Sequence, residues 1–237
     1  MRALLLFIFL LGAGATAYLT HGTHWQLPPH LNPWAPLVIE EPPNWLTRHK
    51  LRRLDDDPQA CLLTLEQARM RAEPLPDREA APGCPLRNVV LVRETRVQVG
   101  TPFTLSCRAA VSLALWEEHV MVPEAERLLG TSVRQIDHFG SFACRNVYGR
   151  EGGRLSQHAS ADALDIAGFR LQDGRRITVS GHWRSEGAEG SERPEAQFLR
   201  AVHRGACQFF DGVFGPEYNQ AHADHLHLDR GPFTLCR

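Results

Sequence analysis

Six cysteines constrain the fold of this chain more than any other feature. They are Cys61, Cys84, Cys107, Cys144, Cys207 and Cys236. The count is even, the spacing is wide, and no two form the C-x-x-C pair usual in redox and zinc-ribbon sites. The set predicts three disulfides and an oxidising compartment. Sequence alone does not determine the pairing, but Cys61 and Cys84 bracket one short helical segment and are the pair that we expect.

The amino-terminal segment also indicates export. Residues 3–19 are mostly apolar and follow Arg2. Their length lies between that of a signal-peptide core and that of a minimal membrane-spanning helix. Ala15-Thr16-Ala17 has the form of a cleavage site, whereas Tyr18 and Trp25 resemble an interfacial flank. We expect residues 1–20 to be a signal peptide or, slightly favoured, a membrane anchor that places the body on the periplasmic side.

The remaining chain divides by composition. Residues 21–55 are rich in Pro and predict an extended linker, because Pro lacks a donor and restricts the residue before it. Residues 56–237 are long enough for one large domain. A formal net charge of −1, with no run of five or more basic residues, argues against electrostatic capture of nucleic acid.

Hydrophobic periodicity predicts an α+β fold with a mostly antiparallel sheet flanked by helices. Helical spacing occurs at 61–73, 102–118 and 194–210. Extended or alternating patterns occur at 87–99, 133–138, 141–147, 164–169 and 176–183, and a short strand runs through Leu226 and Leu228. Asp173-Gly174 predicts the turn of a hairpin between the fourth and fifth of these strands.

Two His-containing stretches suggest a metal site. His158 and Asp165 are too far apart on one helix to bind one ion, but they converge if the chain turns and enters a strand at Leu164. His225 and His227 alternate on the final strand and therefore face the same way. A His, an Asp and one of these two His would give three ligands and an open position, as in catalytic zinc sites. Taken singly, each His is better explained as a capping or surface residue.

The same stretches resemble known families. "SQHASADALDIAGF" at 156–169 and "HADHLHLD" at 222–229 resemble the LAS metallopeptidases, which include lysostaphin, the D-Ala-D-Ala peptidases and the Hedgehog signalling domain. The wider pattern is closer to the bacterial extensin-like C-terminal domain family. Its further elements are "CR" at 144–145, "DGRRITV" at 173–179, "FLR" at 198–200 and "ACQFF" at 206–210. Ala161 replaces the Gly that is usual in the D-Ala-D-Ala peptidase motif.

The resemblance implies a Hedgehog/DD-peptidase-like fold and one Zn²⁺ per chain, held by His158, Asp165 and His227. It also implies that Arg145 polarises the substrate carbonyl and, with Ser156, binds substrate. The general base corresponds to His225 or to Asp224, and the strand geometry favours His225.

The function that these features imply is zinc-dependent hydrolysis of peptidoglycan stem peptides or cross-links by metal-activated water. The enzyme would be of the DD-endopeptidase or DD-carboxypeptidase type and would lie in the periplasm, either anchored to the inner membrane or secreted. The alternative is a non-catalytic, zinc-containing module that binds the cell wall.

Overall fold

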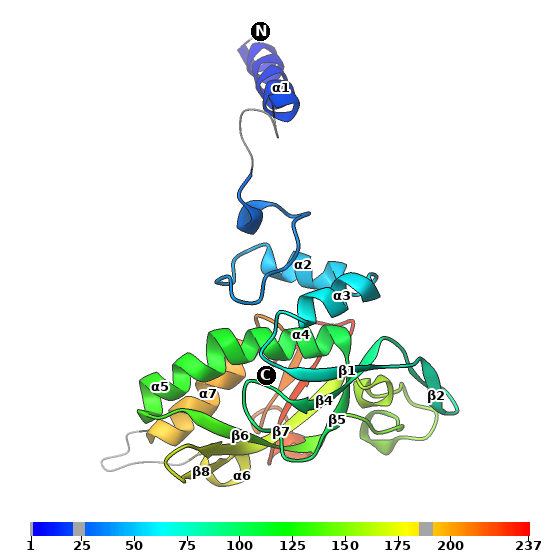
Figure 1. Ribbon diagram of the computed structural model, residues 1–237, viewed down its shortest axis with the longest axis vertical. Coiled ribbons are helices and arrows are strands. Elements are labelled where there is room, and N and C mark those ends of the chain that lie inside the picture. Colours follow the sequence, from blue (N-terminus) through cyan, green and yellow to red (C-terminus); the bar gives the residue numbers. More distant parts are fainter. Residues whose placement is uncertain (1, 21–26, 185–191) are drawn as a thin grey trace. The chain divides into compact units, whose positions relative to one another are not determined.

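The amino-terminal part of the chain forms a unit of its own. The computed structural model describes residues 2–20, 27–184 and 192–237, and the chain divides into units at 1–36 and 37–237. The first unit contains α1 (Arg2–Thr20) and a short 3-10 turn, η1 (Pro29–Leu31) (Figure 1). Within the described residues, no helix has the length and apolarity needed to cross a membrane. The membrane anchor favoured from the sequence is therefore not supported, and the signal peptide stays a prediction.

The second unit begins at Leu37, within the segment expected to be a linker. Leu37 and Ile39 are buried in the core. They are followed by α2 (Thr47–Arg53) and α3 (Pro58–Leu65). The carboxylate of Asp57 caps α3 by accepting from Ala60 N at 2.9 Å, and Pro58 occupies the first helical position.

A small antiparallel sheet follows, and it shortens two of the expected helices. It consists of β1 (Arg71–Leu75), β4 (Val89–Glu94) and β5 (Phe103–Ser106), in the order β1-β4-β5. The helix expected at 61–73 is wrong beyond Leu65, because β1 pairs with β4 instead. The helix expected from 102 begins only at Cys107, because Phe103 and Leu105 alternate into the core as strand residues. A separate hairpin is formed by β2 (Arg78–Ala81) and β3 (Cys84–Leu86).

The larger sheet is mostly antiparallel, as predicted. Its strands are β6 (Val133–Gly140), β7 (Ala163–Leu171), β8 (Arg176–Thr178), β9 (Gly212–Phe214), β10 (Leu226–Asp229) and β11 (Leu235–Cys236). The order is β11-β9-β10-β7-β6, with β8 also paired to β7, and β11 alone runs parallel to its neighbour β9. The β7–β8 hairpin turns at the predicted Asp173-Gly174, but residues 179–182 form the short helix α6 (Val179–His182). The strand expected at 141–147 is wrong, because the chain leaves the sheet after Gly140.

A long helical segment packs near this sheet. It runs from Cys107 to Leu129 as α4 (Cys107–Trp116), a π-helical turn η2 (Glu117–Met121) and α5 (Val122–Leu129). The expected carboxyl-terminal helix is α7 (Pro194–Ala206), which lies beside α5 (Figure 1). The indole Nε1 of Trp116 donates to Val202 O at 2.9 Å and joins α4 to α7. The fold is therefore a mixed α+β arrangement of antiparallel sheets and helices.

All six cysteines form disulfides, but the expected Cys61–Cys84 pair is wrong. Cys61 on α3 bonds Cys107 at the start of α4, and Cys84 bonds Cys144 in the loop after β6. The third disulfide joins Cys207 to Cys236. Proximity in sequence failed as a guide because β1 and β2 carry the chain away from α3 before Cys84 is reached.

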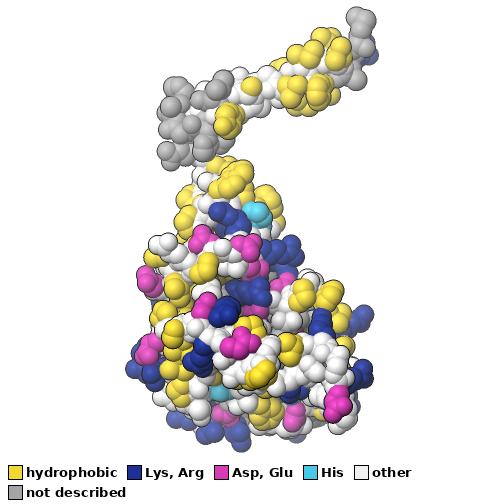
Figure 2. Space-filling model, turned by 90° about the vertical axis from the view of Figure 1, so that its right-hand side faces the viewer, with side chains coloured by type: hydrophobic (Ala, Val, Ile, Leu, Met, Phe, Trp, Pro, Cys, Tyr) yellow, Lys and Arg dark blue, Asp and Glu magenta, His cyan; other side chains and the backbone are white. Residues whose placement is uncertain are grey.

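Figure 2 shows Lys and Arg interspersed with Asp and Glu on the face turned to the viewer.

Candidate metal centre

Two of the three predicted ligands lie opposite each other on neighbouring strands. Asp165 of β7 pairs in register with His227 of β10. Side chains of directly opposed residues project from the same face of a sheet. The Asp165 Oδ1 atom accordingly lies 2.9 Å from His227 Nδ1. The two ligands, 62 positions apart in sequence, are therefore positioned by the register of a single strand pair.

The third predicted ligand reaches this pair through a tight turn. His158 lies on the 3-10 helix η4 (Gln157–Ser160), and the chain enters β7 at Ala163. Ala161, between them, has a left-handed backbone with φ of 55°. The turn is held by Ser106 N, which donates to Ala161 O at 2.7 Å, and by the Asp162 carboxylate, which binds Ser106 Oγ and Arg108. The predicted turn after His158 is confirmed, and it occurs at the position where Gly was expected.

The three side chains converge on one point. His158 Nε2 lies 3.2 Å from Asp165 Oδ2 and 3.2 Å from His227 Nδ1. One donor atom from each residue lies within 4.8 Å of the other two. His158 and His227 are buried, and the Asp165 side chain is 13% exposed. Two imidazole nitrogens and one carboxylate oxygen are a ligand set that suits zinc.

Both imidazoles have their outer nitrogens hydrogen-bonded. His158 Nδ1 donates to Ser141 O at 2.9 Å, and His227 Nε2 donates to Asp229 Oδ2 at 2.9 Å. Each bond places a proton on the outer nitrogen, so that loss of the inner proton would leave a lone pair facing the centre. Such outer hydrogen bonds orient the ligands in most protein metal sites. The residues present therefore fit a metal ion.

The charges around the centre favour a cation. Burial raises the pKa of Asp165, but hydrogen bonds from His158 and His227 outweigh it and hold that pKa below its ordinary value. Burial lowers the pKa of His227, but Asp165 and Asp229 outweigh it and raise that pKa to about 9. Burial, followed by the charges of His227 and His225, lowers the pKa of the neighbouring His222 to about 4. The centre thus attracts a positive charge, which either a proton or a metal ion can supply.

Both candidates for the general base lie beside the centre, in series. The ring of His225 is 12% exposed, and its Nε2 lies 3.5 Å from Asp165 Oδ1. Its Nδ1 donates to Asp224 Oδ1 at 2.8 Å. The Asp224 side chain is 56% exposed and lies on the far side of the His225 ring from Asp165. His225 therefore faces the centre directly, and Asp224 acts on it only through that ring.

A pocket of about 210 Å³ opens onto the centre. Its wall includes the predicted Arg145 and Ser156. Ser156 has a local role as well, because its hydroxyl accepts from His158 N at 3.3 Å and caps η4. Arg145 and a second arginine, Arg154, both line the pocket, and no carboxylate in the described part of the chain pairs with either.

Several residues of the site were not predicted. Asp229 was missed although it continues the alternation of His225 and His227 in "HLHLD", so the sequence contained a signal for it. Arg154 and Tyr148 had no motif to reveal them. Tyr148 has a left-handed backbone with φ of 56°, and its hydroxyl accepts from Asn219 Nδ2 at 2.8 Å across the pocket.

Comparison with known proteins confirms the predicted resemblance to the extensin-like family. The family model described as "Extensin-like protein C-terminus" matches residues 59–237. The match spans most of the chain, and this protein belongs to that family. No curated protein and no solved structure matches the chain.

Proposed function

We propose that this protein is an exported zinc-dependent peptidase, similar to the LAS enzymes, that hydrolyses peptidoglycan stem peptides or cross-links. One observation carries the proposal. The inner nitrogens of His158 and His227 and the carboxylate of Asp165 converge, and both outer nitrogens are already hydrogen-bonded. The three disulfides support export to an oxidising compartment.

Each residue of the centre has a part in the proposed reaction. Bound zinc would polarise the scissile carbonyl and lower the pKa of water. His225 would accept a proton from the attacking water at Nε2 and pass it to the leaving amine. Asp224 would hold the ring through Nδ1. Arg145 and Arg154, which lack carboxylate partners in the described residues, would bind the substrate's carbonyl oxygen or a carboxylate.

The test begins with zinc content and turnover of the full chain. We expect about one zinc per chain by elemental analysis, and release of cleaved products from purified muropeptides. His158→Ala should lose zinc and activity together, because it removes a ligand. Absence of zinc after incubation with excess metal would refute the metal centre and the peptidase assignment together.

His225→Ala separates catalysis from metal binding. This variant should keep its zinc and lose turnover by about a hundredfold or more, the size of a general-base contribution. Asp224→Asn is the matched comparison and should lose less activity, because it alters only the orientation of His225. Zinc at full occupancy without turnover in the unsubstituted chain would instead favour the non-catalytic wall-binding module.

A further inference from the structure

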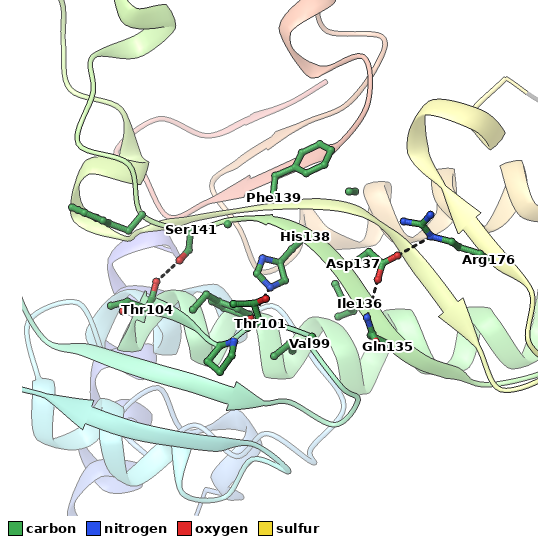
Figure 3. Close-up of a pocket in the computed structure, with 16 residues that line it drawn as sticks. Val99, Thr101, Thr104, Gln135, Ile136, Asp137, His138, Phe139, Ser141 and Arg176 are labelled. Atoms are coloured by element: carbon green, nitrogen blue, oxygen red, sulfur yellow. Dashed lines mark hydrogen bonds and ion pairs between the residues drawn. The ribbon is translucent and has the colours of Figure 1, made fainter.

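A second and larger cavity lies next to the metal centre and has no part in the proposed reaction. It measures about 640 Å³ and lies between the segment 99–104 and strand β6 (Figure 3). Its lining is mixed, with Gln135, Asp137 and His138 from β6 facing Thr101 and Thr104. Because β5 and β6 are end strands of their sheets, the groove lies between two sheet edges.

The edge of β6 along this groove has no neighbouring strand in the described structure. Upstream of the groove the edge is covered: Gln98 N donates to Arg134 O at 3.0 Å, and Ile136 N donates to Gln98 O at 2.9 Å. At Gly100 the chain turns away with φ of 68°. Peptide groups of alternate residues point to the same edge of a strand. The carbonyl of Ile136 and the amide of His138 therefore point into the groove.

The groove is held open at both ends by specific contacts. The Gln98–Gln135 bridge defines one end, and a hydrogen bond from Ser141 Oγ to Thr104 O defines the other (Figure 3). Between them, His138 Nε2 donates to Thr101 O at 3.0 Å. The other ring nitrogen of His138, Nδ1, is a buried acceptor with no partner among the described residues. These contacts fix a slot along β6.

The slot is continuous with the metal centre. Ser141, at its end, accepts the hydrogen bond of His158 Nδ1 through its carbonyl oxygen. Phe139 lines the slot, is 62% exposed, and meets the ring of His225 edge-on with centroids 5.8 Å apart. A chain lying along β6 would therefore extend toward His225 and the three ligands.

We propose that this slot binds an extended peptide as an added strand on β6, with backbone hydrogen bonds to Ile136 O and His138 N. Strand addition to an open edge is a general mode of peptide recognition. A peptide is favoured over a glycan because only a peptide backbone repeats its donors and acceptors at strand spacing. The Asp137 carboxylate binds both Arg170 and Arg176, so the rim carries one excess positive charge that suits a peptide bearing carboxylates. The inference rests on the proposed function for the peptide's identity, a wall stem peptide held beyond the scissile bond.

The direct test is amide exchange with a synthetic cross-linked stem peptide as the probe. The zinc-loaded His225→Ala variant prevents turnover while the peptide is bound. We expect the His138 amide to become protected from exchange when the peptide is added. Peptide binding without any change at His138 would overturn the inference. A chain that dimerises without peptide, and protects His138 by doing so, would assign the edge to a second copy and overturn it too.

Two substitutions in the same background complete the test. His138→Pro removes the edge amide, a change that outward-facing positions of edge strands tolerate, and should weaken peptide binding about fivefold. Thr101→Trp fills the slot from an exposed position and should weaken binding at least tenfold, whereas Ser132→Trp, outside the lining, should not. Unchanged binding in Thr101→Trp would overturn the inference even if His138→Pro failed to fold.

Failure of this inference can be told apart from failure of the proposed function. In one outcome the unsubstituted chain binds zinc and cleaves muropeptides, while Thr101→Trp matches it in peptide affinity. The proposed peptidase function is then supported, and the proposed peptide slot is refuted. If the chain neither retains zinc nor cleaves, and the peptide still protects His138, the slot stands as a peptide-binding site without the proposed chemistry.

Discussion

At the scale of single residues, the metal centre depends on side chains that never touch the ion site. Asp229 is the clearest case, because its Oδ2 holds His227 Nε2 while its Oδ1 accepts from Gly231 N at 2.6 Å. The carboxylate packs directly against Gly212 of the adjacent strand, where a Cβ would overlap it. Gly212 is therefore required for the orientation of a ligand that it does not contact.

Substitution of Gly212 tests this dependence. Gly212→Ala should displace the Asp229 carboxylate from His227 and lower zinc affinity about tenfold to a hundredfold, the usual cost of losing an outer hydrogen bond to a ligand. Competition with a chromogenic chelator measures the change. Ser132→Ala, at an exposed position outside the lining of the pocket, is the control. Equal zinc affinity in the two variants would show that Asp229 does not orient His227.

At the scale of elements, the helical segment 107–129 has a charged group in its interior. Glu117 begins the π-helical turn and is 1% exposed. Its carboxyl lies 2.5 Å from Thr95 Oγ1, and it accepts from Arg96 N at 3.1 Å. Burial, with a smaller contribution from the nearby Glu118, outweighs these hydrogen bonds and raises its pKa to about 7. Glu117 is therefore protonated in the folded chain at mildly acidic pH.

This burial predicts a pH-dependent stability. The folded pKa lies above the unfolded one, so the folded state holds more protons and stability falls as pH rises from about 4.5 to about 7. The loss attributable to Glu117 is on the order of 3 kcal/mol. Glu117→Gln should lack it, because an amide can donate to Thr95 and accept from Arg96 without a charge.

Urea unfolding at pH 5 and pH 8 measures this effect. Between pH 5 and pH 8 the unsubstituted chain should lose more unfolding free energy than Glu117→Gln does. Glu118→Gln, one residue away and partly exposed, should leave most of this pH dependence, because the charge of Glu118 is the smallest contribution to the shift. Parallel profiles for Glu117→Gln and the unsubstituted chain would mean that Glu117 is ionised in the fold.

The elements that sequence predicted well are those with a single strong pattern. The β7–β8 hairpin, α7 and β10 were predictable because a turn dipeptide, a helical stripe and an alternation each favoured one structure. The start of the segment 102–118 was not, because Leu105 also fits the helical stripe of the residues that follow, and only pairing with β4 makes 103–106 a strand. The three predicted metal ligands come from motif and periodicity, with the choice of His227 taken from the family resemblance. Arg154, Tyr148 and the slot along β6 arise from tertiary contacts with no local pattern.

At the scale of the whole molecule, cross-links and buried ion pairs tie distant parts of the chain to the site. Arg230, next to Asp229, is almost fully buried and binds Asp211 at 2.8 Å and Asp55 at 3.2 Å. The Cys84–Cys144 disulfide joins the β2–β3 hairpin to the loop that carries Arg145. Residues near both ends of the second unit therefore support the pocket.

Removing one disulfide should affect stability and substrate binding together. Replacing both Cys84 and Cys144 by Ser opens a loop with a sequence separation of 60. The expected loss is about 2–4 kcal/mol of unfolding free energy, with weaker substrate binding because the Arg145 loop loses its tether. Thermal unfolding and the KM for muropeptides are the measurements. Replacing Cys207 and Cys236 instead should lower stability by a similar amount and leave KM unchanged. A KM equal in both double variants would show that the tether does not position Arg145.

The strand pairing that joins Asp165 to His227 also determines at which stage of folding the centre can assemble. His158 and Asp165 are brought together by a local turn, but His227 arrives only when β10 adds to β7, a contact across 62 positions. A chain that crosses a membrane from its amino terminus delivers β10 after every other ligand. Under the proposed export, the complete centre forms only after nearly all of the chain has crossed the membrane. The proposed metal would then be acquired in the compartment that receives the chain.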